Sequence, residues 1–180
     1  DTLMNTITGD CAGSMKRYGI AYRQVDLQNG LPDLTAIRQA AADTNIKLVF
    51  IQRSRGYAVR QTLSCEQIAE ICDTIKAVNP NAAILVDNCY GEFTETLEPT
   101  MVGADLCAGS LIKNPGGGLA PTGGYIVGRA DLVENAAYRL TAPGIGGECG
   151  CTTGQNRMLY QGLFLAPHIT MQAIKTAIFC

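Results

Sequence analysis

Short apolar runs alternate along this chain with segments whose apolar residues recur at helical spacing. The runs expected to form strands are bounded by turn residues and cover residues 19–27, 47–52, 82–88, 105–110 and 123–128. Alternating strands and helices are typical of βαβ units around a parallel sheet. A continuous apolar run such as residues 83–86 also indicates a strand buried on both faces. The sequence therefore predicts an α/β fold in which helices flank a mostly parallel sheet.

Capping residues predict where several helices begin. Asp33 is a good N-cap for a helix that runs to about residue 43. Ser64 and Gln67 have the spacing of a capping box, and the apolar residues that follow share one helical face. Further helices are expected at 130–139 and, after Gly154, in two segments of which the last begins with Pro167 in its first turn.

Charge and hydropathy exclude several classes of partner. The formal net charge is −2, and the 14 basic residues are scattered without a run or a stripe. The electrostatic footprint of a protein that binds nucleic acid or an anionic membrane is therefore missing. No apolar stretch reaches the roughly 18 residues that a spanning helix needs. We expect a small-molecule partner, no nucleic acid and no membrane.

The eight cysteines indicate a reducing compartment. Cys107 lies inside an apolar run, where a free thiol packs as a small hydrophobic group. We therefore predict reduced thiols and a cytoplasmic protein. Cys149 and Cys151 are close in sequence, but the only histidine, His168, follows in a separate helical region. Two thiols alone provide too few ligands, so no metal site is predicted.

Polar side chains follow three of the predicted strands at the point where each strand ends. Arg53 follows the strand at 47–52, Asp87 lies near the end of the strand at 82–88, and Ser110 is the last residue of the strand at 105–110, with Lys113 after it in the stretch SLIKNPGGG. In open parallel sheets, ligands bind beyond the carboxyl ends of the strands. These residues therefore form a candidate active site, and the backbone amides of the glycine-rich loop are suited to approach a phosphate.

One chemistry suits this set of residues. Pyridoxal 5'-phosphate needs a lysine for covalent attachment, an acidic partner for its pyridinium nitrogen, and hydroxyl or amide donors for its phosphate. Lys113, Asp87 and Ser110 match these three roles. Simpler interpretations remain open, since a lysine in a glycine-rich loop is often a solvated cation and an aspartate at a strand end is often a turn former. A nucleotide-binding P-loop is disfavoured because the stretch lacks the G-x-x-x-x-G-K-[ST] pattern.

Several longer blocks resemble a known family. VDNCYGEF, GADLCAGSLIKNPGGG, PTGGYIVGR, AYRLTAPGIGGE and YQGLFLAPH together look like the aluminium-resistance, methionine gamma-lyase-like family of pyridoxal-phosphate enzymes. The resemblance covers nearly the whole chain. It implies an aspartate-aminotransferase-like large domain of fold type I, of which residues 1–180 would be the central part. An N-terminal segment and a C-terminal small domain would lie outside these residues.

Carried over residue by residue, the resemblance makes Lys113 the Schiff-base lysine, Asp87 the pyridinium partner and Ser110 a phosphate ligand. Arg53 stands where related enzymes place a residue that contacts the ring oxygen of the cofactor. Related lyases often have a hydroxyl residue just before the lysine, whereas this chain has Ile112. Related enzymes also build their active sites at a subunit interface, so the resemblance implies a homodimer or homotetramer.

The resulting expectation is a carbon-sulfur lyase that acts on a sulfur amino acid by β- or γ-elimination. The alternatives are another pyridoxal-phosphate reaction, either aldol cleavage or transamination, and a non-catalytic stress-response protein that retains the fold. Because the aromatic residue that stacks on the cofactor and the arginine that grips the substrate carboxylate are missing, the 180 residues alone are expected to be inactive.

Overall fold

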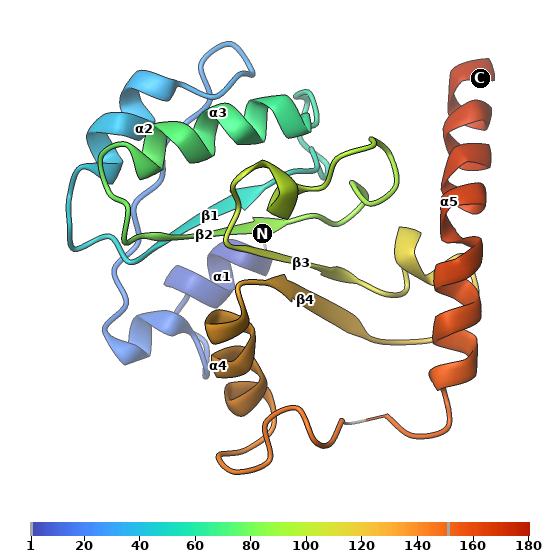
Figure 1. Cartoon of the computed structure of the whole chain (residues 1–180). Coiled ribbons are helices and arrows are strands. Elements are labelled where there is room, and N and C mark those ends of the chain that lie inside the picture. Colours follow the sequence, from blue (N-terminus) through green and yellow to red (C-terminus); the bar gives the residue numbers. More distant parts are fainter. Residues whose placement is uncertain (1, 151) are drawn as a thin grey trace.

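The computed structural model describes residues 2–150 and 152–180. At its centre is a four-stranded sheet in the order β1-β2-β3-β4 (Figure 1). The strands are β1 (Leu48–Gln52), β2 (Ala83–Asp87), β3 (Leu106–Ser110) and β4 (Gly124–Gly128). The β1–β2 and β2–β3 pairs are parallel, and β3–β4 is antiparallel. The predicted α/β fold with a mostly parallel sheet is thereby confirmed.

The helices follow the capping signals of the sequence. Among the described residues they are α1 (Thr2–Thr8), α2 (Leu34–Ala41), α3 (Cys65–Lys76), α4 (Ala130–Leu140) and α5 (Asn156–Phe179), with 3-10 helices η1 (Met15–Tyr18), η2 (Pro99–Val102) and η3 (Asn114–Gly116). The Asp33 carboxylate accepts from the Ala36 N–H at 2.9 Å. The predicted capping box is present, since Ser64 Oγ accepts from the Gln67 N–H at 3.2 Å and Gln67 Oε1 accepts from the Ser64 N–H at 3.0 Å.

The hydrophobic core lies between the sheet and the helices α2 and α3, which run along one face of it (Figure 1). Ile84 and Val86 of β2 and Ile68 and Ile75 of α3 are all 0% exposed. Burial of a side chain of this size stabilises the fold by about 1.5–3 kcal/mol. Cysteines join this core, and burial raises the pKa of Cys107 to about 12, as expected for a thiol that packs as a small hydrophobic group.

The opposite face of the sheet is only partly covered. Along β2, buried residues alternate with half-buried ones, so that Leu85 and Asp87 point away from α3. We call this side the open face. The prediction that the apolar strands are buried on both faces is therefore confirmed for one face only. An apolar run alone cannot distinguish these cases, because the side chains alternate between faces whatever covers them.

Two predicted elements differ from the structure. Residues 19–27 form no strand, and the nearest pairing is an isolated bridge between Gln28 and Leu31. The segment is largely exposed and has no neighbouring strand among the described residues, so its β propensity finds no partner. The two helices expected after Gly154 are one helix, α5, with Pro167 inside it. Pro167 removes a single N–H donor, and this helix continues through it.

Helix α5 stands at the end of the sheet where β3 ends, next to η3 (Figure 1). Its first half contacts the loop that follows β3, and residues 171–180 are exposed. Within residues 2–150 and 152–180, no helix combines the length and the apolar character needed to cross a membrane.

A buried carboxylate joins several elements at the other end of the sheet, where β2 and β3 begin. Asp105 Oδ2 accepts from Lys76 Nζ at 2.7 Å and from the Ile84 N–H at 2.8 Å. Asp105 Oδ1 accepts from Arg129 Nη1 at 3.2 Å. The Asp105 side chain is 9% exposed. This carboxylate therefore holds α3, β2 and the start of α4 together.

We predict that Asp105→Ala lowers the free energy of unfolding by about 2–3 kcal/mol, because the Ile84 N–H and the Lys76 ammonium lose a buried acceptor. Urea unfolding at neutral pH measures this effect. The matched control is Asp10→Ala, which removes an ion pair between side chains that are 91% and 59% exposed. Equal losses of stability in the two variants would contradict the role given to Asp105.

Candidate active site

Asp87 and Ser110 lie on the same face of the sheet at the edge where β1, β2 and β3 end, which we call the carboxyl edge. Asp87 pairs with Ala108 in the parallel register of β2 and β3, and Ser110 follows two residues later. Because side chains alternate along a strand, Ala108 and Ser110 share the open face with Asp87. The structure thus brings a carboxylate and a hydroxyl to one side of the carboxyl edge.

Lys113 joins them from the loop after β3, immediately before η3. Its Nζ lies 4.4 Å from the centroid of the Tyr90 ring. The Cys89 thiol interacts with both the Lys113 amine and the Asp87 carboxylate. The backbone N–H of Cys89 also donates to Asp87 Oδ1 at 3.0 Å. Lys113 and Asp87 therefore share Cys89 as a neighbour, at the same end of the sheet.

The polar groups around Lys113 favour its protonated form. Burial lowers the pKa of the Lys113 amine, but the combined influence of Cys89, Tyr90 and Asp87 outweighs it, so the pKa stands above its ordinary value. Burial is also the main reason why the pKa of the Cys89 thiol is raised. At neutral pH the site therefore holds an ammonium beside a neutral thiol and the Asp87 carboxyl.

Arg53 was predicted to contact the ring oxygen of a cofactor, but its side chain bonds to the loops of the protein instead. Its side chain is 1% exposed, and its guanidinium is bonded to protein groups. Nε donates to the Leu63 carbonyl at 3.2 Å, and Nη1 donates to Asn88 Oδ1 at 2.6 Å and to the Gly91 carbonyl at 3.2 Å. Nη2 donates to Glu95 Oε1 at 2.5 Å. With its donors occupied beneath the loops, Arg53 is unsuited to contact a cofactor ring, and we leave it out of the candidate site.

A second polar cluster lies behind Ser110, on the face of the sheet that the helices cover. Tyr125 of β4 donates through its hydroxyl to Glu92 Oε1 at 2.7 Å. Glu92 is 4% exposed, and its Oε2 has no hydrogen-bond partner among the described residues. A side chain at Gly109 would collide with both Glu92 and Tyr125, which explains the glycine there. Burial raises the pKa of the Glu92 carboxyl, and the bond from Tyr125 only partly opposes this.

Few features of the sequence indicate this cluster. Tyr125 lies in an apolar strand, where it resembles an ordinary core residue, and its link to Glu92 spans 33 residues. The glycine at position 109, just before Ser110, was a usable signal. A glycine inside a strand often marks a close approach by another group.

The glycine-rich loop packs against a helix. Side chains at Gly116 or Gly117 would collide with backbone atoms, and a side chain at Gly162 of α5 would collide with the Gly116 carbonyl. Gly116 and Gly117 are buried in this contact. The absence of side chains at Gly117 and Gly162 is therefore required for α5 to approach η3, and so to hold the loop that carries Lys113. Gly116, in contrast, must be small because it packs against Leu111 and Ala120 of its own loop. This packing accounts for two of the three glycines without a phosphate.

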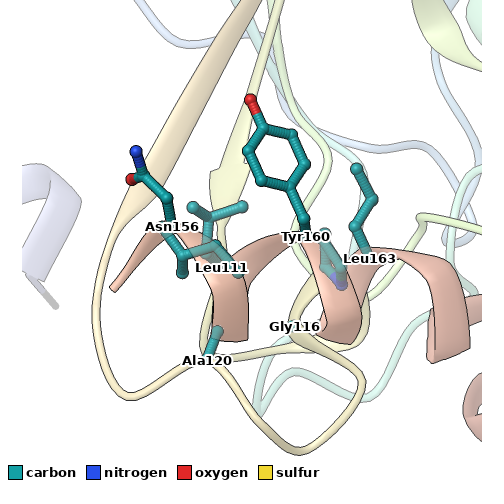
Figure 2. Close-up of a pocket in the computed structure, with 8 residues that line it drawn as sticks. Leu111, Gly116, Ala120, Asn156, Tyr160 and Leu163 are labelled. Carbon is teal, nitrogen blue, oxygen red and sulfur yellow. The ribbon is translucent and has the colours of Figure 1, made fainter. Parts of the chain in front are cut away.

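A small cavity lies on this contact rather than at the titratable groups. It has a volume of about 220 Å³ and lies between η3 and α5, where Figure 2 shows Leu111, Tyr160 and Leu163 around it. Its lining is mostly apolar and includes none of Asp87, Ser110 and Lys113. The chemical groups instead lie on the open carboxyl edge. Of the cysteine pair considered for a metal, Cys151 lies outside the described residues.

The arrangement of the strands defines the fold class of the chain. The Escherichia coli protein YhfS, a pyridoxal-5'-phosphate-dependent protein of known structure, is 20% identical and superimposes on 91% of this chain and 40% of its own with a TM-score of 0.65. The chain therefore has the fold of the fold-type-I pyridoxal-phosphate enzymes and contains part of their large domain.

The family follows from closer matches. The family model for methionine gamma-lyase matches residues 1–180, and the chain belongs to this family. The uncharacterized protein YnbB of Bacillus subtilis is 51% identical over 172 residues, which are 95% of this chain and 41% of YnbB. A carbon-sulfur lyase involved in aluminum resistance from Clostridium novyi is 54% identical, with a TM-score of 0.94 over 100% of this chain and 44% of its own. The chain thus spans less than half the length of these relatives.

We predict that Glu92→Gln changes how stability depends on pH. Because burial raises the pKa of Glu92 in the folded protein above the ordinary value of 4.5, the contribution of its protonated form is fully present below about pH 4.5. That contribution is lost as the pH rises through the folded pKa. The neutral glutamine has no such loss, so the stability of the variant relative to the wild type should improve with pH.

Urea unfolding at intervals from pH 4.5 to 8 tests this expectation. Glu134→Gln, at an exposed position on α4, is the control and should follow the wild type. A constant stability difference between Glu92→Gln and the wild type across this range would show that Glu92 is not titrating with a raised pKa.

Proposed function

We propose that this chain is the cofactor-holding part of a pyridoxal-phosphate-dependent carbon-sulfur lyase that acts on a sulfur amino acid by β- or γ-elimination. The observation that carries the proposal is that the Cys89 thiol, at the carboxyl edge, interacts with both the Lys113 amine and the Asp87 carboxylate. Membership of the methionine gamma-lyase family supports the lyase class. The name of the Clostridium novyi relative supports the same class of reaction.

The donor set fits the cofactor. The Lys113 amine is suited to bind its aldehyde covalently, the Asp87 carboxylate to accept a hydrogen bond from its pyridinium nitrogen, and the Ser110 hydroxyl to donate to its phosphate. In support, Asp87 and Ser110 share the open face, and all three side chains are partly exposed. When bound, pyridoxal phosphate draws electrons away from the α-carbon of the substrate.

The protein residues then have separate tasks. An ionised Asp87 keeps the ring nitrogen protonated, which maintains the electron withdrawal. Once the substrate has replaced it on the cofactor, the Lys113 amine can take the proton from the α-carbon and later supply a proton to the products as a general acid. Elimination releases the sulfur group as a thiol and leaves an unsaturated amino acid, which water hydrolyses to a keto acid and ammonia.

For the whole protein we also propose a homodimer or homotetramer with cytoplasmic localisation. The cysteines that the structure describes are free thiols, which suits a reducing compartment. Residues beyond this chain would supply the aromatic group that stacks on the cofactor and the arginine that binds the substrate carboxylate. Sedimentation of the full-length protein tests the oligomer.

We predict that Lys113→Ala abolishes covalent attachment of pyridoxal phosphate, because it removes the amine that forms the bond. Borohydride reduction of the loaded full-length protein, followed by peptide mass spectrometry, detects the attached cofactor at Lys113 in the wild type. Lys175→Ala, at an exposed position on α5, is the control and should retain attachment. Cofactor reduced onto another lysine of the wild type would reject the assignment.

Asp87→Asn and Ser110→Ala separate the other two roles. Asp87→Asn should retain the cofactor and lower the turnover of a sulfur amino acid by about a hundredfold or more, the scale of a lost electrostatic contribution. Ser110→Ala should weaken cofactor affinity by about tenfold to a hundredfold, since it removes one hydrogen bond to a charged phosphate. Unchanged affinity in Ser110→Ala would exclude it as a phosphate ligand.

The products identify the reaction. Release of a thiol and a keto acid from a sulfur amino acid supports elimination, whereas release of an aldehyde or transfer of the amino group would indicate aldol cleavage or transamination. Failure of the full-length protein to bind pyridoxal phosphate would favour a non-catalytic protein that retains the fold.

A further inference from the structure

The Lys113 amine contacts two consecutive residues for which the proposed chemistry has no use. They are Cys89 and Tyr90, in the loop that follows β2. The amine lies 4.4 Å from the Tyr90 ring centroid, a distance at which the face of the ring attracts a cation. The Cys89 thiol interacts with the same amine and with Asp87. An aromatic face, a thiol and a carboxylate are therefore all neighbours of the Lys113 ammonium.

The backbone of this loop holds the two side chains in place. Tyr90 has φ +68°, a left-handed conformation that residues with side chains rarely adopt. The residues on either side are anchored, because Arg53 donates to Asn88 Oδ1 at 2.6 Å and to the Gly91 carbonyl at 3.2 Å. The Gly91 N–H donates to the Asn88 carbonyl at 2.7 Å, which closes the turn. The strained backbone thus turns the Tyr90 ring toward Lys113.

We propose that Cys89 and Tyr90 are positioning residues that form a resting site for the free Lys113 amine, and hold it as an ammonium beside Asp87 whenever it is not bound to the cofactor. The part of this inference that concerns the cofactor rests on the proposed function. The resting site itself is a property of the protein alone.

Four titratable groups act on the amine. Asp87, Cys89 and Tyr90 come from the end of β2 and its loop and favour the ammonium, while burial opposes it. Glu92, on the covered face, also interacts with the Lys113 charge. Only an unprotonated amine can attack an aldehyde, so the resting site makes Lys113 a slower nucleophile than a solvated lysine. It also keeps the amine close to the place where it must act.

Competitive acetylation of the cofactor-free, full-length protein tests the resting site. Trace acetic anhydride is applied between pH 7 and 10, and mass spectrometry compares the rate at Lys113 with that at the exposed Lys175. We expect Tyr90→Leu to raise the relative rate at Lys113 about two- to fivefold at pH 8, which is the loss of one exposed cation–π contact. Tyr90→Phe keeps the ring and should react like the wild type at pH 8.

The shape of the pH profile separates this role from a change in access. Loss of the resting site raises the rate at neutral pH, and the increase fades as the amine loses its proton at high pH. Better access would raise the rate equally at every pH. Cys89→Ala should act in the same direction as Tyr90→Leu. Tyr18→Leu is the control, since Tyr18 is 66% exposed against 59% for Tyr90 and lies in another segment.

An unchanged rate in Tyr90→Leu, an equal increase in Tyr90→Phe, or an increase independent of pH would each overturn the inference. Because no cofactor is present in these measurements, they stand apart from the proposed function. A protein that fails to bind pyridoxal phosphate can still have the resting site, and a pyridoxal-phosphate enzyme can lack it.

Discussion

The carboxyl edge of this sheet depends on one buried cation. The Arg53 guanidinium leaves the end of β1 and bonds to the Leu63 carbonyl, the Asn88 side chain and the Gly91 carbonyl, so that it ties together the loops after β1 and β2. Burying a guanidinium is unfavourable unless its charge and donors are compensated. Glu95 and Glu98 supply the charge, at 2.5 Å and 3.7 Å. Arg53 thereby anchors both ends of the turn that presents Cys89 and Tyr90.

The two faces of the sheet have different roles in the site, one facing a ligand and the other supporting the strands. On the open face, Asp87, Ser110 and Lys113 remain accessible enough to meet a ligand. On the covered face, Glu92 and Tyr125 fill the space behind Gly109 and support the end of β3. A strand can serve both purposes because its side chains alternate, so that one residue holds the loop and the next faces the ligand.

Helix α5 adds a constraint from outside the sheet. It reaches the Lys113 loop only because Gly117 and Gly162 carry no side chains. The position of Lys113 therefore depends on contacts made from both directions, with the turn after β2 on one side and the α5 contact on the other. The turn acts on the amine itself and the helix acts on its loop, and together they determine where the amine lies.

The sequence by itself determined where most strands and helices lie and which residues are candidates for the site. Apolar periodicity and capping residues located β1–β4, α2, α3 and α4, and the rule that ligands bind at strand ends selected Asp87, Ser110 and Lys113. These signals are local or follow from topology. Only the tertiary structure decided that residues 19–27 form no strand, that Arg53 is buried, and that the glycines serve a helix contact. The physical reason is that each of these features depends on partners distant in sequence, which short-range sequence patterns do not identify. Arg53, for example, bonds to Asn88, 35 residues away.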